Sequence, residues 1–292
     1  MAAFGYVVWQ RHQQTKFQTN FIQSANTSYG DDARYISFGA NYVFAIPKSF
    51  GVDESSINGV QLLLPAEGNI KVNKLDQLYD VGGVAVQPIT DVKASDNAGL
   101  KNYVLKSLVP DLKKSLSQAV TTTFSRPGKY ERATIVVKKD GKQVRQIYAY
   151  GGPRPFLVVA QGSSDAFNEV TTTLVTANNY KAKDDIESIK KAVTSIVTLL
   201  QQGKVQALYD NGSSLFKEKT SPTSLANTVD ASSSYLHRNI VVLGGSLQNN
   251  KFIAQLYFPP VAKDELPSVG LVSLQKENNT WKAAGFSLPH KA

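Results

Sequence analysis

The chain contains no cysteine, and it has only one methionine and three histidines among 292 residues. The absence of cysteine excludes disulfide bonds, zinc sites built from thiolates and cysteine nucleophiles. It does not identify the compartment, because an exported bacterial protein and a cytosolic protein can both lack cysteine. The scarcity of histidine leaves few candidates for acid–base catalysis or for metal binding.

The three histidines do not form a catalytic or metal-binding pattern. His12 lies in a polar segment near the start of the chain, His290 near its end, and His237 beside a predicted strand. No histidine pair has the spacing of a zinc site, and neither the G-x-S-x-G nucleophile motif nor a phosphate-binding glycine motif occurs. We therefore predict no catalytic residue, metal ligand or cofactor, and we expect His237 to be a surface or helix-end residue.

Charged residues are also sparse, at 19% against about 25% in typical soluble domains. Serine, threonine, asparagine and glutamine take their place, a composition that we associate with exported proteins. The net charge is nevertheless +9, so an anionic neighbour has to be considered. Lysine and arginine occur in twos and threes, without the run of five or more that is typical of nucleic-acid tails. This favours a solvated basic surface over a nucleic-acid site, with anionic lipid or wall polymer as an alternative contact.

The N-terminal residues are apolar but too few to cross a membrane. Residues 2–9 would rise only about 12 Å as a helix, against about 30 Å for the hydrocarbon core of a bilayer. Their apolar and aromatic side chains, followed by basic ones, are typical of the end of a membrane helix; they are Phe4, Tyr6, Val7, Val8 and Trp9. We predict that residues 1–10 are the remnant of a membrane anchor and 11–33 a polar stalk. A short packed helix or a disordered tail is the alternative.

Strand patterns then define a first predicted domain, residues 34–177. The segment "YISFGANYVFAIP" alternates apolar residues, and further short apolar runs are bounded by glycine and proline. An amphipathic stretch over residues 100–116 predicts a helix that Pro110 kinks or divides. Asp140 and Gly141 lie between two β-rich runs and predict a type I′ hairpin turn. Ser164 predicts the N-terminal cap of a later helix.

A linker over residues 178–184 precedes the second predicted domain, residues 185–292. Six apolar residues at helical spacing predict an amphipathic helix: Ile186, Ile189, Val193, Ile196, Val197 and Leu200. Ser221 followed by Pro222 predicts the start of another helix, and four strand patterns complete the chain. The sequence thus predicts an α+β protein of two domains, an N-terminal α/β/α sandwich with an antiparallel sheet and a C-terminal domain of helices on a curved antiparallel sheet.

The order of helices and strands in the second domain resembles the nuclear transport factor 2-like (cystatin-like) fold, through "LLQQGKVQALYDNGSSLFKEKTSP" and the closing "WKAAGFSL". The first domain resembles the photosystem PsbP-like sandwich, through "YVFAIPKSFGV" and "RPFLVVAQGSSDAFNEVTTTL". Both families commonly occur as extracytoplasmic, membrane-tethered bacterial domains, so the resemblance implies a location in the cell envelope. Neither family implies one activity.

Some nuclear transport factor 2-like members are isomerases or dehydratases that place an aspartate beside a tyrosine or histidine in the cone between helix and sheet. Asp210, Asp230, Tyr209 and Tyr235 are the candidates for such a site here. Structural roles, as core tyrosines and capping aspartates, are favoured for them. Any pocket of the C-terminal domain is predicted to involve Tyr209, Asp210, Tyr235, Tyr257 and Trp281.

Three functions remain open. The favoured one is a non-catalytic, membrane-anchored, extracytoplasmic interaction protein with a protein partner in the cell envelope. This architecture resembles assembly factors of conjugation and type IV secretion machines. The second is binding of a small apolar ligand, or a simple proton transfer, in the C-terminal cone. The third is nucleic-acid binding through the basic surface, in which aromatic and basic residues of "VRQIYAYGGPRPF" would stack bases.

Overall fold

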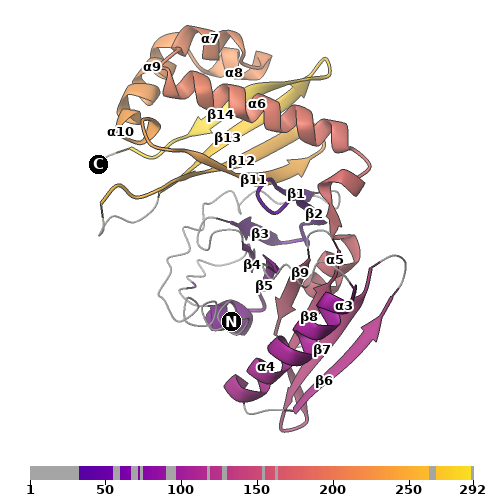
Figure 1. Cartoon of the computed structure of the whole chain (residues 1–292). Helices are drawn as coiled ribbons and strands as arrows, with labels where there is room; N and C mark the ends of the chain where they lie inside the picture. Colours follow the sequence, from indigo (N-terminus) through magenta and orange to yellow (C-terminus); the bar gives the residue numbers. More distant parts are fainter. Residues whose placement is uncertain are drawn as a thin grey trace. The chain divides into compact units, whose positions relative to one another are not determined.

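The computed structural model describes residues 33–54, 60–66, 72, 75–89, 97–116, 119–126, 130–152, 155–161, 164–262 and 268–290. These form an α+β protein with two compact units, each built on a seven-stranded antiparallel sheet (Figure 1). Ile46–Leu174 belong to the first unit, and residues 33–45 together with those from 175 onward belong to the second. The predicted anchor residues lie outside the described part of the chain. Within that part, no helix combines the length and the apolar character that crossing a membrane requires.

The sheet of the first unit has the strand order β3-β4-β5-β9-β8-β7-β6. Its strands are β3 (Phe50–Asp53), β4 (Gln61–Pro65), β5 (Val84–Pro88), β6 (Ala119–Ser125), β7 (Arg132–Lys139), β8 (Lys142–Tyr150) and β9 (Phe156–Ala160). Helices α2 (Leu75–Asp80), α3 (Asn97–Tyr103) and α4 (Val109–Leu116) supply buried side chains to one core with it. Helix α5 (Asp165–Thr173) contacts β9, and its buried Phe167 and Val170 lie outside that core.

The helix predicted around Pro110 is continuous but irregular. A π-helical segment, Val104–Leu108, joins α3 to α4. Pro110 has no backbone N–H to donate to the preceding turn, and a π-helical turn immediately before it changes the hydrogen-bond spacing. Leu100, Val104, Leu108 and Leu112 still point into the core, with exposed fractions of 2% or less. The proline therefore alters the helix without changing the face that is buried.

The second unit has the strand order β10-β2-β1-β11-β12-β13-β14. Its strands are β1 (Arg34–Ser37), β2 (Tyr42–Ala45), β10 (Val175–Thr176), β11 (Val241–Gln248), β12 (Lys251–Phe258), β13 (Ser268–Glu277) and β14 (Thr280–Ser287). Its helices are α6 (Lys183–Gln201), α7 (Val205–Asp210), α8 (Ser214–Lys219), α9 (Pro222–Ala231) and α10 (Ser233–Leu236). Helix α6 lies across the sheet of β11–β14 (Figure 1).

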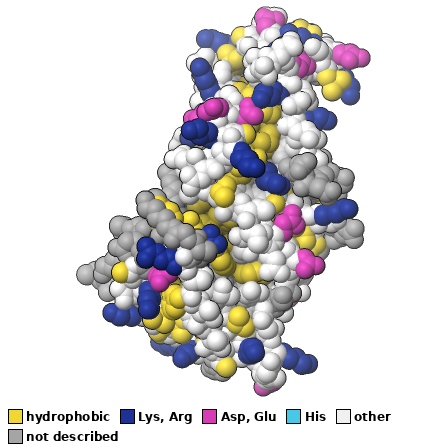
Figure 2. Space-filling view, turned by 90° about the vertical axis from the view of Figure 1, so that its right-hand side faces the viewer, with side chains coloured by type: hydrophobic (Ala, Val, Ile, Leu, Met, Phe, Trp, Pro, Cys, Tyr) yellow, Lys and Arg dark blue, Asp and Glu magenta, His cyan; other side chains and the backbone are white. Residues whose placement is uncertain are grey.

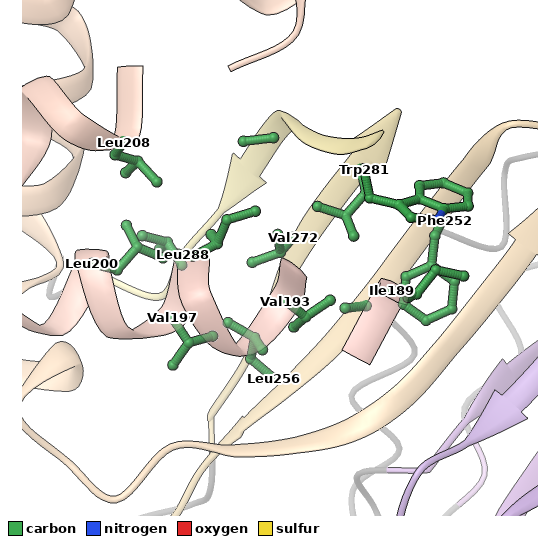
Figure 3. Packing of buried hydrophobic residues seen from close by; sticks show 14 of the residues in the cluster. Ile189, Val193, Val197, Leu200, Leu208, Phe252, Leu256, Val272, Trp281 and Leu288 are labelled. Carbon is green, nitrogen blue, oxygen red and sulfur yellow. The ribbon is translucent and has the colours of Figure 1, made fainter. Parts of the chain in front are cut away.

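The core of the second unit lies between α6 and this sheet. The six apolar residues predicted for α6 are all buried, as the helical spacing requires. Figure 3 shows Ile189, Val193 and Val197 of α6 among side chains from the strands, including Phe252 and Val272. Asp185 at the start of α6 accepts an ion-paired hydrogen bond of 2.6 Å from Lys276 Nζ on β13. The long helix is thus held to the sheet along its apolar face and by an ion pair near its first turn.

The predicted bounds of the first domain, residues 34–177, are wrong at both ends. β1 and β2 pair with the C-terminal sheet. β1 is antiparallel to β11, with Arg34 opposite Leu247 and Ser37 opposite Gly244. β10, also assigned to the first domain, pairs with β2. The sequence pattern identified the β1–β2 segment as extended, but a strand pattern carries no information about a partner roughly two hundred residues away.

Several local predictions are confirmed. Asp140 and Gly141 have φ angles of 52° and 75° in the turn between β7 and β8, as a type I′ turn requires. The Ser164 hydroxyl accepts a hydrogen bond of 3.0 Å from the Phe167 amide and so caps α5. Ser221 caps α9, with Pro222 in its first turn. These signals succeed because each depends on only a few neighbouring residues.

The place of β1 in the second unit predicts which unit loses stability when Ile36 is shortened. Ile36 is fully buried in the core that contains α6. In a Trp9→Phe background, Trp281 is the one tryptophan left and reports on that core. Ile36→Ala should lower the unfolding free energy that Trp281 fluorescence reports by about 2–5 kcal/mol.

Ile135→Ala is the matched control, because Ile135 is equally buried in the core of the first unit. It should leave the Trp281 transition nearly unchanged. An Ile36→Ala variant whose Trp281 transition matches that of the parent would contradict the assignment of β1.

Candidate binding groove in the C-terminal unit

A groove of about 370 Å³ opens between α8, α9 and β14. Phe216, Leu225 and Phe286 supply its apolar surface, and Thr220, Ser224 and Thr228 supply hydroxyl groups. Lys219 and Leu215 also line it; half of the Leu215 surface is exposed. The volume falls in the range of small-ligand pockets, about 300–1,000 Å³. We refer to this feature as the α8–α9 groove.

One wall of the groove is positioned by the loop that covers the outer edge of β14. The Ser213 amide donates a hydrogen bond of 2.7 Å to the Ala283 carbonyl, and the Ala283 amide donates one of 3.3 Å to the Asn211 carbonyl. Gly212 lets the Phe216 ring pack closely against this loop, since a Cβ there would lie 2.5 Å from that ring and 2.9 Å from the Tyr209 carbonyl oxygen. The loop thus pairs with β14 at Ala283 and fixes the start of α8.

A second device orients α8. The Ser213 hydroxyl accepts a hydrogen bond of 3.2 Å from the Phe216 amide and caps the helix. The Phe216 ring then meets Phe286 of β14 edge-on, with the ring centroids 5.6 Å apart. Phe216 is 5% exposed and belongs to the core of the unit. The apolar wall of the groove is therefore the outer side of the core itself.

The other wall depends on a β-bulge. Ser273 pairs with Gly285 and Leu274 with Ala283, so Ala284 is an extra residue in β14. Trp281 and Ala283 face the core before the bulge, whereas Phe286 and Leu288 do so after it. The extra residue therefore changes which side chains point inward. It leaves the small residues Ala284 and Gly285 beside the groove.

The five residues predicted for a C-terminal pocket do not line this groove. Tyr209, Tyr235 and Trp281 pack against the core of the unit as aromatic fillers. The Tyr235 ring, for example, meets Phe258 edge-on at 6.1 Å. Tyr257 precedes Phe258 on β12 and therefore points to the opposite face of the sheet. Asp210 accepts a hydrogen bond of 2.9 Å from the Gln206 side chain within α7.

The residues that line the groove were not predicted from the sequence. Leu215 is an apolar residue whose exposure becomes visible only in the fold. Gly285 gave no signal, because its position depends on the bulge. His237, by contrast, is the exposed C-cap residue of α10, as predicted.

A carboxylate on the hairpin of β13 and β14 ties the start of α8 to the sheet. Glu277 Oε1 accepts a hydrogen bond of 3.0 Å from the Ser214 amide, and Lys282 Nζ lies 3.3 Å from Oε2. These contacts hold the pKa of Glu277 below its ordinary value of 4.5, chiefly through the hydrogen bond from the Ser214 backbone; desolvation opposes the shift. The ionised carboxylate accepts these bonds more strongly than the neutral acid does, so the tie weakens in acid.

Among the described residues of "VRQIYAYGGPRPF", Arg145 lies on the opposite face of the sheet from Tyr150 and Phe156. Arg145 lies on the helix-covered face of β8, with its guanidinium 4.2 Å from the centre of the Tyr79 ring. Tyr150, on the other face, lies 5.0 Å from Phe156 and 5.4 Å from the guanidinium of Arg132. Burial raises the pKa of Tyr150, and the charge of Arg132 opposes the shift. Alternation along β8 thus separates Arg145 from Tyr150, although the two are close in sequence.

No model of a known protein family matches the chain, and a search of curated proteins also finds no match. The groove therefore has to be interpreted from its own geometry. The groove is lined by apolar side chains and by hydroxyl-bearing ones, together with one lysine. Among the described residues that line it, Lys219 is the single ionisable side chain. This composition suits binding of a chain or ligand that is mainly apolar and carries some hydrogen-bonding groups.

The Glu277 contacts predict an acid-dependent loss of stability. Because the pKa of Glu277 is lowered on folding, the unfolded state binds more protons than the folded state near pH 4.5, and stability is lost as the pH falls through the folded pKa. Thermal melts at successive pH values should show this loss in the parent protein. Glu277→Gln should be less stable than the parent near neutral pH and should show a smaller decline in acid. Parallel melting curves for the two proteins across the titration would contradict this role.

Proposed function

We propose that the protein is a non-catalytic interaction protein of the cell envelope, tethered to the outer side of the cytoplasmic membrane by its N-terminal residues. Its proposed partner is another envelope protein, which would make it an accessory component of an envelope or secretion assembly. The α8–α9 groove is the proposed contact surface. The observation that carries this proposal is the groove itself, an apolar and hydroxyl-lined surface that is open to solvent.

The connectivity of the chain supports a tethered binding unit. The polar residues 11–33 lead in sequence directly to β1, which lies inside the sheet of the second unit. A tether at the N-terminus would therefore attach first to the unit that carries the groove. A pulling force on the tether would then reach the groove-bearing unit through β1, a strand that is paired on both sides.

On the face that Figure 2 shows, the distribution of charge supports protein contact over nucleic-acid binding. Figure 2 shows lysine and arginine side chains dispersed over the visible face, interspersed with acidic ones, rather than gathered in one stripe. A nucleic-acid site typically needs a continuous basic surface that follows the phosphate backbone. A net charge of +9 still favours a location close to anionic lipid or wall polymer, which would assist a tethered protein.

Site-specific crosslinking in the native cells tests the proposal. A photoreactive amino acid at Leu215, which is 50% exposed in the groove, should capture an envelope protein. The same probe at Val241, which is 42% exposed and not part of the groove, is the control position. The protein should sediment with the membrane fraction. Recovery of free cytosolic protein, without an envelope partner at Leu215, would contradict the proposal.

Substitution of Thr228 should fill the groove without unfolding the unit. Thr228 lies on α9, its side chain is exposed, and it lines the groove. Thr228→Phe should place an aromatic ring in the groove and reduce the Leu215 crosslink by about tenfold, if binding weakens by about 1.4 kcal/mol. Thr223→Phe is the matched control, since Thr223 is also an exposed threonine of α9 but does not line the groove. Equal crosslinking by both variants would exclude the groove as the contact surface.

The volume of the groove also supports a second candidate, binding of a small apolar ligand. A ligand of this kind should raise the melting temperature of the parent protein and of Thr223→Phe but not that of Thr228→Phe. The melting temperature of the purified parent protein should then rise without any envelope partner present. This result would distinguish ligand binding from contact with an envelope protein.

A further inference from the structure

β6, the last strand of the first unit's sheet, has one edge with which no described residue pairs. β6 lies at one end of the strand order and pairs with β7 through all seven of its residues, from Ala119 opposite Lys138 to Ser125 opposite Arg132. On its other side, no backbone hydrogen bond joins it to any residue that the structure describes. Thr121, Thr123 and Ser125 are exposed. A strand that is paired on one side presents a row of unpaired N–H and C=O groups on the other.

The other sheet edges are short or carry a backbone contact. The outer edge of β14 is bonded at Ala283 to residues 211–213. β3 has four residues and β10 has two. β6 is longer than either, and its sequence "AVTTTFS" contains no proline and no charged residue. It therefore lacks the features that usually prevent one strand edge from pairing with another.

The sequence of β6 is complementary to itself when it is read in the antiparallel direction about Thr122. In that register Thr121 stands opposite Thr123, and Val120 stands opposite Phe124 of the second strand. Threonine pairs and pairs of an aromatic with a β-branched residue are both favourable across antiparallel strands. No like charges are brought together within the strand. Val120 and Phe124 are already half-buried beside the core of the first unit, so pairing would extend an existing apolar surface.

We propose that β6 is a self-association surface, through which a second copy of this chain adds its own β6 in antiparallel register centred on Thr122. The two seven-stranded sheets then become one continuous sheet across a two-fold axis. Such an interface uses the same patch on both copies, as two-fold dimers do. The backbone groups of the edge supply hydrogen bonds, and the Val120–Phe124 pairs supply apolar contact. The inference does not depend on the function of the groove.

A pair of double variants tests both the surface and the register. In Thr121→Lys/Thr123→Lys, each introduced lysine faces another lysine of the second copy, whereas in Thr121→Lys/Thr123→Glu each lysine faces a glutamate. Both threonine side chains are exposed, so folding should not change; circular dichroism and melting curves verify this. Sedimentation velocity over a range of concentrations should show a reversible dimer for the parent protein. The lysine pair should weaken it by about tenfold or more, and the lysine–glutamate pair should restore it.

Each alternative result has a defined meaning. A parent protein that stays monomeric at every concentration overturns the proposal, and so does a lysine-pair variant that dimerises as well as the parent. If both variants are equally weak, the register centred on Thr122 is wrong. Pairing centred on Thr121 or Thr123 would oppose like charges in both variants and would give that result.

Disulfide crosslinking provides an independent test, because the chain has no cysteine of its own. In the proposed register the two copies of Thr122 face each other, at a separation that a disulfide spans. Thr122→Cys should form a covalent dimer on mild oxidation of the full chain. In Ser125→Cys the two thiols would be about 20 Å apart along the strands, so that variant is the matched control. Equal crosslinking of the two variants, or none of Thr122→Cys, would overturn the arrangement.

Discussion

The pairing of β1 with β11 is the interaction on which the second unit depends. It joins residues 34–37 to residues 244–247 and brings Ile36 into the core beneath α6. β2 then pairs with β1 and adds Val43 to the same core. Without these strands β11 would become an edge, and part of the apolar face under α6 would be open to water. Closing so long a loop is entropically unfavourable, although the loss grows only with the logarithm of its length. Burial of these apolar side chains offsets it.

This pairing also makes the first unit an insertion within the second. The chain leaves the second unit after β2, at Ala45, and returns at β10, where Val175 stands opposite Val43. The Ala177 amide donates a hydrogen bond of 2.9 Å to the Asn41 carbonyl and secures the return. The two ends of the inserted segment are therefore adjacent, a geometry that commonly permits one domain to be inserted into another. Each unit can keep its own core, since the described core residues of the two units form separate clusters.

The sequence predicts the structure well wherever the signal is local. The apolar stripe from Ile186 to Leu200, the Asp140–Gly141 turn and the cap at Ser164 each depend on neighbouring residues and are confirmed. The partner of β1 and the bulge at Ala284 depend on residues far away, and no local pattern contains them. The residues predicted for a pocket do not line the groove, and aromatic residues among them such as Tyr235 and Trp281 pack in the core. The groove arises instead where a loop, a helix cap and the bulge meet, so its lining could not be recognised from residue type.

Residues 34–37 form an inner strand of the C-terminal sheet, and this strand links the N-terminal segment directly to the unit with the groove. Hydrogen–deuterium exchange of the full chain tests this placement, because β1 lies between β2 and β11 and its amides are enclosed by pairing on both sides. We expect the amides of Arg34–Ser37 to exchange slowly, together with those of β11 and β12. Rapid exchange of Arg34–Ser37 while β11 and β12 remain protected would contradict it.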